Sequence, residues 1–509
     1  MTKVFTAALN GIQAAIVEVE VDVISGLPLV VIVGLPDMAV KEAKERVRSA
    51  IKNSQAIFPN SRVAVNLAPA DLPKNGSHFD LPIAVSILIN SGQLAASVGK
   101  TLFLGELALD GQVRPVPGVL PIVISAKERG FEEIVVPQDN ADEAALVGGV
   151  KIIPVGSLAQ TVAFLQKIKP ILPHRGRVRG QSGKVVDAGS LDMRDIKGQE
   201  HAKRVAEIAA AGGHNLLMIG PPGSGKTLLA RAFATILPML TEEEVLEVTK
   251  IHSVAGAFTT TGSLLTTRPF RAPHHTASAV ALVGGGSYPR PGEISLAHRG
   301  VLFLDELPEF SKNVLESLRQ PLEDGVVTVA RATGAVTFPA RFTLVAAQNP
   351  CPCGYYGDLV KPCICSPGQI LNYRKKVSGP LLDRIDLHVE VPRITYEKIT
   401  AAASAEDSQA VQRRVERARL RQRRRFQKAA LNLNSNAELS SKQVETFCPL
   451  DRAGAELLKS ALNSLHLSPR SYFRVLKISR TIADLAASDD IAAPHVAEAI
   501  QYRPQESSM

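Results

Sequence analysis

The run GPPGSGKT, from Gly220 to Thr227, combines the residue types that bind the phosphates of a nucleotide. It fits the pattern GxxxxGK[ST], follows the apolar residues 216–219 and precedes the helix-favouring residues 228–236. In this arrangement, backbone N–H groups and a helix N-terminus surround the phosphates. We expect Lys226 to reach the terminal phosphates and the Thr227 hydroxyl to hold Mg²⁺. The predicted nucleotide-binding residues are Gly220, Pro221, Pro222, Gly223, Ser224, Gly225, Lys226 and Thr227.

A second motif, GVLFLDE at residues 300–306, is an apolar strand that ends in two acidic residues. If this strand lies beside the phosphate-loop strand in a parallel sheet, Asp305 comes close to Thr227 and to the magnesium ion. Glu306 would then polarise the attacking water. A strand that ends in Asp-Glu also occurs as a plain surface turn, but together with the upstream loop it predicts an ATPase.

Two further polar residues follow apolar segments. Asn349 ends the apolar run 341–348 and could orient the attacking water, or it could simply begin the Asn-Pro turn. Arg384, in GPLLDRIDL, is a candidate arginine finger that reaches the ATP of a neighbouring subunit and stabilises transition-state charge. The alternative for Arg384 is a salt bridge within the chain, to Asp383 or Asp386.

Four of the five cysteines form two C-x-C pairs, Cys351 with Cys353 and Cys363 with Cys365. Four thiolates on a short loop can close a tetrahedral zinc site, which would order a segment too small to have its own core. Free or redox-active thiols and an iron–sulfur cluster are the alternatives. Cys448 stands alone and is expected in the core, and disulfides are not expected.

The composition sets broad limits. With 509 residues and 45% apolar content, the chain should hold about three domains. Its net charge of +9 and pI near 9.3 favour a polyanionic partner such as nucleic acid, although a basic enzyme could have the same charge. The N-terminus has no apolar signal region and no run of 18 residues is apolar throughout, so we expect a soluble, cytoplasmic protein without membrane contact.

The elements that position these motifs begin with an α/β domain over residues 1–172. Valines alternate with acidic residues over 17–23, which is the pattern of a half-buried strand. Further strands are predicted at 29–33 and 62–67, and helices at 37–53 and 79–90.

This first domain resembles the proteolytic domain of Lon, a fold of the S5 domain 2 type, at PKNGSHFD (73–80) and GELALDGQVRPVPG (105–118). Lon-type proteolysis needs a serine nucleophile and a lysine base. Aligning the two segments puts His78 at the serine position and Leu120 at the lysine position, so the dyad is missing. A structural or partner-binding role is therefore expected, with residual hydrolysis through Ser77 as the alternative.

The remaining chain divides into three parts. Residues 173–190 are predicted to be a basic, Gly- and Arg-rich linker, with a nucleic-acid contact as the alternative. Residues 191–395 are expected to form the nucleotide-binding core and residues 396–509 a helical lid. Within the lid, residues 411–428 hold eight arginines and one lysine against the single acid Glu416. This segment is either a solvated linking helix or a phosphate-tracking surface.

Four strings resemble one family, the ComM/YifB magnesium-chelatase-like AAA+ ATPases: RAPHHTAS (271–278), GEISLAH (292–298), NPCPCG (349–354) and SGPLLDRID (378–386). The resemblance runs nearly end to end. It implies a multidomain α/β protein with a Lon-protease-like α/β domain, a central P-loop AAA+ parallel-sheet domain and a C-terminal helical lid. It also implies a homohexameric, ATP- and Mg²⁺-dependent DNA helicase or translocase that promotes branch migration while transforming DNA is integrated during competence.

The resemblance also suggests site residues. Arg470 matches the second sensor position, where it would contact the terminal phosphate of its own chain's ATP, unless it forms a packing salt bridge in the lid. Arg268, Arg271 and Arg331 lie in insertions that would face the ring pore and meet DNA, with packing or a subunit-interface ion pair as the alternative. Arg331 would lie near the tip of a hairpin over 326–338. His274 and His275 lie in the same interval and could alternatively bind metal.

The expected DNA partner is single-stranded or branched and is bound without base readout, because a translocase needs backbone contacts that tolerate any sequence. Two other functions stay open. One is a protein-remodelling or chelatase-type motor that acts on a partner protein, and the other is an ATP-regulated DNA-binding protein that does not translocate.

Overall fold

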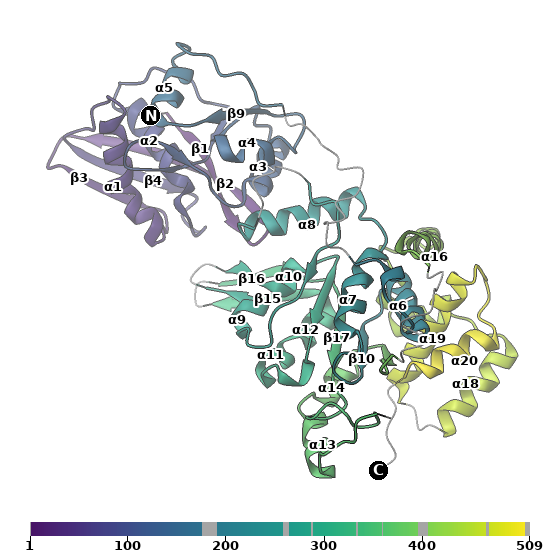
Figure 1. The fold of residues 1–509 in the computed structure, drawn as a ribbon. Coiled ribbons are helices and arrows are strands. Elements are labelled where there is room, and N and C mark those ends of the chain that lie inside the picture. The colour runs from purple at the N-terminus through teal and green to yellow at the C-terminus, as the bar shows by residue number, and fades with distance from the viewer. Residues whose placement is uncertain are drawn as a thin grey trace.

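The computed structural model describes residues 2–175, 191–257, 264–286, 289–331, 334–358, 360–394, 406–464 and 468–503. An N-terminal α/β body, a central body around a second sheet and a C-terminal group of helices follow one another along the chain (Figure 1). Most of the predicted linker, residues 176–190, lies outside the described residues. None of the described helices is both long and apolar enough to cross a membrane.

The N-terminal body contains a seven-stranded sheet of order β3-β4-β2-β1-β5-β8-β9. The predicted half-buried strand is part of β2, in which Val17, Val19 and Val21 are fully buried. Strand β2 pairs antiparallel with β1 and β4, and the other neighbours are parallel. The strands are β1 (Val4–Asn10), β2 (Gln13–Ile24), β3 (Leu29–Val33), β4 (Arg62–Ala68), β5 (Thr101–Phe103), β8 (Glu133–Pro137) and β9 (Lys151–Val155).

Helices cover this sheet where the pattern predicted them. Helix α1 (Met38–Asn53) begins where the Asp37 side chain accepts a hydrogen bond from the Val40 backbone, a standard N-cap. Helix α2 (Asp80–Asn90) is buried along nearly its whole length. The predicted strands at 29–33 and 62–67 and both predicted helices are thus confirmed. Also present are α3 (Val119–Glu128), α4 (Ala141–Ala144) and α5 (Leu158–Leu165).

The residues at the aligned Lon dyad positions lie in the interior. The His78 ring nitrogen Nε2 is 2.7 Å from the Ala7 carbonyl oxygen, and burial lowers the pKa of His78 to about 4. Leu120 is fully buried. The Ser77 hydroxyl donates to the Glu106 carboxylate. These surroundings suit a non-catalytic domain, and the loss of the dyad stays a prediction.

The central body is built on a five-stranded sheet of order β11-β14-β17-β10-β18, parallel at every described pairing. Its short apolar strands are buried because helices cover both faces. Residues that follow β10, β14 and β17 therefore meet at one edge of the sheet. The strands are β10 (Leu216–Ile219), β11 (Phe270–Arg271), β14 (Val301–Leu304), β17 (Thr343–Gln348) and β18 (Leu387–Glu390).

Two hairpins and several helices surround this sheet. The hairpin predicted over 326–338 is confirmed as β15 (Val326–Arg331) with β16 (Gly334–Pro339), and a smaller one joins β12 (Gly284–Gly285) to β13 (Arg290–Pro291). The helices are α6 (Glu200–Gly212), α7 (Lys226–Thr235), α8 (Glu242–Val254), α9 (Ala279–Val283), α10 (Glu293–Leu296), α11 (Lys312–Ser317), α12 (Arg319–Asp324), α13 (Pro367–Lys375) and α14 (Gly379–Leu382).

The C-terminal helices share one core with the central sheet. Val415 and Phe426 belong to the same buried cluster as Leu229 and Phe233 of α7, the helix that follows the phosphate loop. Cys448 is buried, as expected, and burial raises the pKa of its thiol to about 12. The helices are α16 (Ser408–Lys428), α17 (Ser441–Phe447), α18 (Arg452–Ser464), α19 (Pro469–Leu485) and α20 (Ala493–Gln501).

Helix α8 joins the N-terminal body to the central one and lies between the two in Figure 1. The Ser253 hydroxyl on α8 donates to the buried Glu143 carboxylate, and the Gly118 N–H donates to the Ser253 carbonyl oxygen at 3.0 Å. Ile12, at the turn between β1 and β2, packs against the cluster beneath the β15–β16 hairpin. The first body thus contacts the second through both buried polar and apolar groups.

Candidate functional site

The phosphate loop connects β10 to α7 with the backbone that its glycines allow. Gly223 and Gly225 have φ angles of +75° and +93°, a region in which residues with a Cβ are strained. The Lys226 ammonium donates to the carbonyl oxygens of Gly220 and Pro221 at 2.7 and 2.9 Å. Desolvation lowers the pKa of Lys226, and the nearby acidic charges oppose this shift. The lysine is thus held inside the loop, where a phosphate can replace the two carbonyls.

Thr227 and Asp305 come together as the parallel register predicts. The Thr227 hydroxyl donates to Asp305 Oδ2 at 2.8 Å, and Asp305 Oδ1 accepts from the Glu306 N–H at 3.0 Å. A hydroxyl and a carboxylate are oxygen ligands of the kind that Mg²⁺ prefers. The donor set beside the phosphate loop therefore fits the predicted ion.

Asn349 also reaches this edge of the sheet. It follows β17, and its Oδ1 lies 3.4 Å from Lys226 Nζ. The amide is therefore next to the position of the terminal phosphate, as its proposed role in orienting water requires.

His275 is the neighbour of Glu306 that sequence reasoning missed. Its Nδ1 lies 3.6 Å from Glu306 Oε2, and the His274 ring packs on it with centroids 4.1 Å apart. Strand β11 pairs Arg271 with Leu302, so the same register carried four residues on aligns His275 with Glu306. Because the sequence does not reveal that β11 pairs with β14, it offered no signal for this contact. Within the described part of the chain, His274 and His275 do not belong to a group of three or more side chains that could hold a metal ion.

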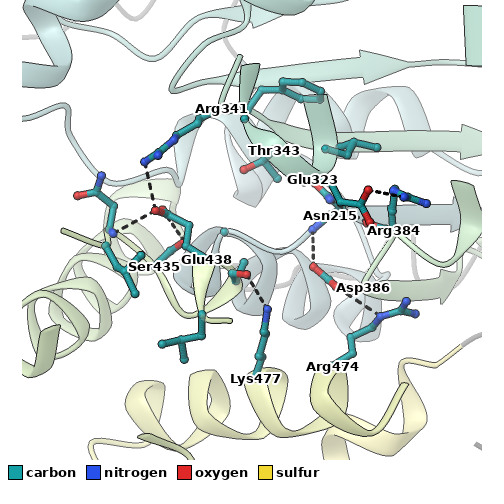
Figure 2. Close-up of a pocket in the computed structure, with 18 of the residues that line it drawn as sticks. Asn215, Glu323, Arg341, Thr343, Arg384, Asp386, Ser435, Glu438, Arg474 and Lys477 are labelled. Atoms are coloured by element: carbon teal, nitrogen blue, oxygen red, sulfur yellow. Dashed lines mark hydrogen bonds and ion pairs between the residues drawn. The ribbon is translucent and has the colours of Figure 1, made fainter. Parts of the chain in front are cut away.

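Arg384 and Arg470 lie together at the opposite edge of the sheet. Both form ion pairs with Glu323, Arg384 at 2.6 Å and Arg470 at 3.1 Å. They line a cavity of about 860 Å³ between the central body and the lid. Asn215 and Thr343, at the amino ends of β10 and β17, also line it (Figure 2).

The expectation that Arg470 contacts the nucleotide of its own chain does not fit this arrangement. The four residues of β10 separate the cavity from the phosphate loop by roughly 13 Å. Helix α19 begins at Pro469, and its Arg474 is fixed at the amino edge by Asp386, 3.5 Å away. The docking of the lid therefore directs Arg470 to the Glu323 side. Arg384 likewise pairs with Glu323, whereas Asp383 or Asp386 was the expected alternative.

The cavity itself carries an excess of positive charge. Nine basic and six acidic side chains line it. Arg474 and Lys477 reach it from α19, and Arg384 reaches it from the turn that follows α14 (Figure 2). An anionic group would be attracted to this surface.

Two of the three DNA candidates are engaged within the chain. The Arg268 side chain is only 12% exposed, pairs with Glu244 at 3.0 Å and donates to backbone carbonyls. Burial lowers the pKa of Arg268. Arg271 forms a two-pronged pair with Glu293 at 2.6 and 2.7 Å. Both side chains are thus held by acidic partners of their own chain. Their roles at DNA stay predictions, and the Arg331 side chain lies outside the described residues.

Eight of the nine basic residues of helix α16 fall into a partnered and an exposed set, and the ninth, Arg423, lines the cavity. Arg414, Arg421 and Arg425 pair with acids, and Arg419 donates to backbone carbonyls. Arg413, Arg417, Arg424 and Lys428 are exposed and form no ion pair with a described residue. At about 100° per residue these four form one stripe opposite the buried face. We call Arg413, Arg417, Arg424 and Lys428 the α16 stripe.

The four clustered cysteines come together on the loop between β17 and α13. Their sulfur atoms all lie within 4.8 Å of one another, and all four are free thiols. The predicted four-thiol cluster is thus present as a possible metal site.

Comparisons with known proteins agree with the order of the bodies. The family described as "Magnesium chelatase, subunit ChlI" matches residues 192–399, "Subunit ChlI of Mg-chelatase" matches 19–140, and "Magnesium chelatase, subunit ChlI C-terminal" matches 405–503. The predicted boundaries near 172, 190 and 395 stay predictions.

Similar curated proteins extend over nearly the full length. Competence protein ComM of Haemophilus influenzae is 46% identical over 98% of this chain and 97% of its own. The uncharacterised protein YifB of Escherichia coli is 45% identical over 98% and 96%. The magnesium-chelatase 67 kDa subunit of Chlorobaculum parvum is 31% identical, but over only 31% of this chain and 23% of its own.

Proposed function

This chain belongs to the ComM and YifB family of magnesium-chelatase-like AAA+ proteins, and from this premise we propose that it is an ATP-driven DNA motor that promotes branch migration while transforming DNA is integrated. The observation that supports the proposal is the placement of the candidate nucleotide-site residues at two opposite edges of one sheet. The phosphate loop and Glu306 lie at one edge, and Arg384 and Arg470 lie at the other. If these residues form one site, it would be complete only when copies of the chain meet.

A ring of identical chains would complete it. A head-to-tail contact brings the amino edge of one sheet against the carboxyl edge of the next, and a rotation that closes makes a ring. The basic cavity around Arg384 would then face a neighbour's triphosphate. We propose a homohexamer in which both Arg384 and Arg470 act on the neighbouring chain's ATP. When bound, Mg²⁺ would neutralise charge between the terminal phosphates.

Each residue at the carboxyl edge would have its own role in ATP hydrolysis. Lys226 would exchange its two carbonyl partners for phosphate oxygens. Thr227 and Asp305 would hold the ion, Glu306 would accept a proton from the attacking water, and Asn349 would orient that water. For the four-cysteine cluster we propose Zn²⁺, because four thiolates form a closed structural site for that ion.

DNA contact requires exposed cations, and the α16 stripe supplies them. The stripe extends along about 22 Å of helix. Arg413 and Arg417 are about 6 Å apart along the axis, and so are Arg424 and Lys428. Such spacing suits the backbone of a nucleic acid, and no base-reading group accompanies it. Ser408, the first residue of α16, hydrogen-bonds Thr235 at the end of α7 at 2.7 Å. A force exerted by DNA on the stripe would therefore be transmitted to α7, the helix that follows the phosphate loop.

Replacing Arg413, Arg417, Arg424 and Lys428 by alanine should weaken DNA binding to the same extent for different sequences. Because each phosphate contact releases counterions, the slope of log K against log salt concentration should flatten by about 3. The measurement is anisotropy titration of labelled single strands of two unrelated sequences at several salt concentrations.

A matched control lies on α1, where Lys41, Lys44, Arg48 and Lys52 form an exposed row interrupted by acidic residues. The corresponding fourfold alanine variant removes the same charge and should keep the wild-type slope. Equal flattening in both variants would mean that net charge alone, and not the α16 stripe, determines the binding.

The deciding test of the proposed function compares ATP hydrolysis with and without DNA and measures strand exchange on a synthetic three-strand junction. We expect DNA to stimulate hydrolysis and ATP to drive migration of the junction. Stimulation without migration would leave an ATP-regulated DNA-binding protein. Hydrolysis that no DNA affects would favour a motor acting on a partner protein.

A further inference from the structure

The sulfur atoms of the four-cysteine cluster all lie within 4.8 Å of one another, close enough to bind a single tetrahedral ion. Four thiolates each about 2.3 Å from one ion lie about 3.8 Å apart. Cys351 Sγ lies 3.4 Å from Cys353 Sγ and 3.7 Å from Cys363 Sγ, and the distance between Cys353 and Cys363 is 3.6 Å. An iron–sulfur cluster would hold its thiolates farther apart, because several irons and sulfides separate them. The spacing therefore favours one ion.

Backbone donors already surround these sulfurs. The N–H of Tyr356 points to Cys351 Sγ at 3.3 Å, and the N–H of Cys365 points to Cys363 Sγ at 3.4 Å. Such donors stabilise bound thiolates and fix their orientation. The apolar residues Val360 and Ile364 of the loop are 72% and 86% exposed, so they contribute little buried apolar surface. A metal ion would supply the missing core.

This loop lies directly on the phosphate loop. Gly354, with φ of +85°, is so close that a Cβ there would lie 2.5 Å from Cδ and 2.7 Å from Cγ of Pro222. Only glycine allows this approach. Cys351 follows Asn349 by two residues, and the Asn349 amide contacts Lys226. The segment from Asn349 to Gly354 thus contacts the phosphate loop twice, at Lys226 and at Pro222.

A second connection runs from the middle of the loop, between its two cysteine pairs. Asp358 pairs with Arg393 at 3.3 Å, and Arg393 follows β18. The neighbouring Pro392 carbonyl accepts from Gln199 Nε2 at 2.5 Å, and the same nitrogen lies 3.4 Å from the Ser224 carbonyl oxygen of the phosphate loop. Displacement of the cysteine loop would therefore change both sides of the phosphate cradle.

We propose that the four cysteines bind one Zn²⁺ and that the loop it orders braces the phosphate loop, so that nucleotide affinity depends on metal occupancy. The inference rests on the proposed binding of ATP. It assigns the zinc a function in the motor site, and it makes Gly354 a positioning residue for the phosphate loop.

The test uses the full chain and two readouts, zinc per chain by elemental analysis and the Kd of a fluorescent, non-hydrolysable ATP analogue. Wild type should carry about one zinc per chain. The double variant C363S/C365S should lose the zinc and bind the analogue at least about tenfold more weakly. Gly354→Ala should keep the zinc and still weaken binding, because its Cβ displaces the loop from Pro222. Cys448→Ser, in the lid core, should retain both zinc and affinity.

Two results would overturn the inference. One is a wild-type chain purified under reducing conditions that binds the analogue but no metal. The other is a zinc-free C363S/C365S chain, or a Gly354→Ala chain, with wild-type affinity. A wild-type chain that binds no ATP analogue would instead overturn the proposed ATPase together with the brace. Gly354→Ala keeps all four thiols, so the brace can be tested even if the double variant does not fold.

Discussion

A Glu306→Gln chain should bind ATP like the wild type but hydrolyse it about 10²- to 10⁴-fold more slowly, which is the usual contribution of a general base. Glutamine keeps the size and the hydrogen-bonding capacity of the side chain but cannot accept the proton of the attacking water. Asp305 and Thr227, which we propose as the magnesium ligands, stay intact. Binding is measured with the fluorescent analogue, and hydrolysis is measured in single-turnover experiments with saturating protein.

Glu309→Gln provides the matched control. Glu309 lies three residues farther along, is exposed and pairs with Lys376 at 3.2 Å at the surface. Its substitution removes the same charge from the same segment and should leave turnover near the wild-type rate. Wild-type turnover by Glu306→Gln would mean that another group activates the water.

An Arg384→Ala chain should also bind ATP normally, and its turnover should fall by about 10³- to 10⁵-fold, as it does when an arginine finger is missing. The structure indicates which chain's site should lose activity. Arg384 lies at the amino edge of the sheet beside Glu323, whereas the phosphate loop lies at the carboxyl edge. The loss should therefore affect the site of the neighbouring chain. Arg319→Ala, which removes an arginine paired at the surface with Glu316, is the control.

Mixing the two inactive chains tests this directly. A site is active when its phosphate loop comes from an Arg384→Ala chain, which keeps Glu306, and its finger comes from a Glu306→Gln chain, which keeps Arg384. With equal amounts and random assembly, about one quarter of the sites in a head-to-tail ring meet both conditions. The mixture should recover about that share of wild-type hydrolysis. No recovery, with mixed assembly verified by a tag on one chain, would mean that Arg384 serves its own chain or only packs against Glu323.

Local patterns were sufficient for the carboxyl edge. The GPPGSGKT run, the strand that ends at Asp305 and the strand that ends at Asn349 each depend on residues adjacent in sequence. Once these strands are parallel neighbours, their carboxyl ends must meet, so Thr227, Asp305 and Asn349 follow without further information. The same reasoning explains why β3, β4, α1 and α2 were predicted at nearly the observed bounds, and why the alternating segment 17–23 was recognised as part of β2.

Contacts between distant segments were beyond such patterns. Arg268 was expected at DNA, yet from the loop before β11 it meets Glu244 of α8, and its side chain is almost fully buried. His275 approaches Glu306 only because β11 lies beside β14 in register. In both cases, the charge or ring was visible in the sequence and its partner was not.

The sequence by itself thus determined the chemistry of the phosphate loop, its acidic partners and the four-cysteine loop, because each is encoded by residues within one short segment. Only the tertiary structure decided that Arg470 joins Arg384 on Glu323, that part of the arginine-rich α16 is exposed, and that Gly354 rests on Pro222. The physical reason is that a periodic pattern indicates which face of a helix is buried but not which body it docks against. The direction of a side chain at a helix terminus depends on that docking.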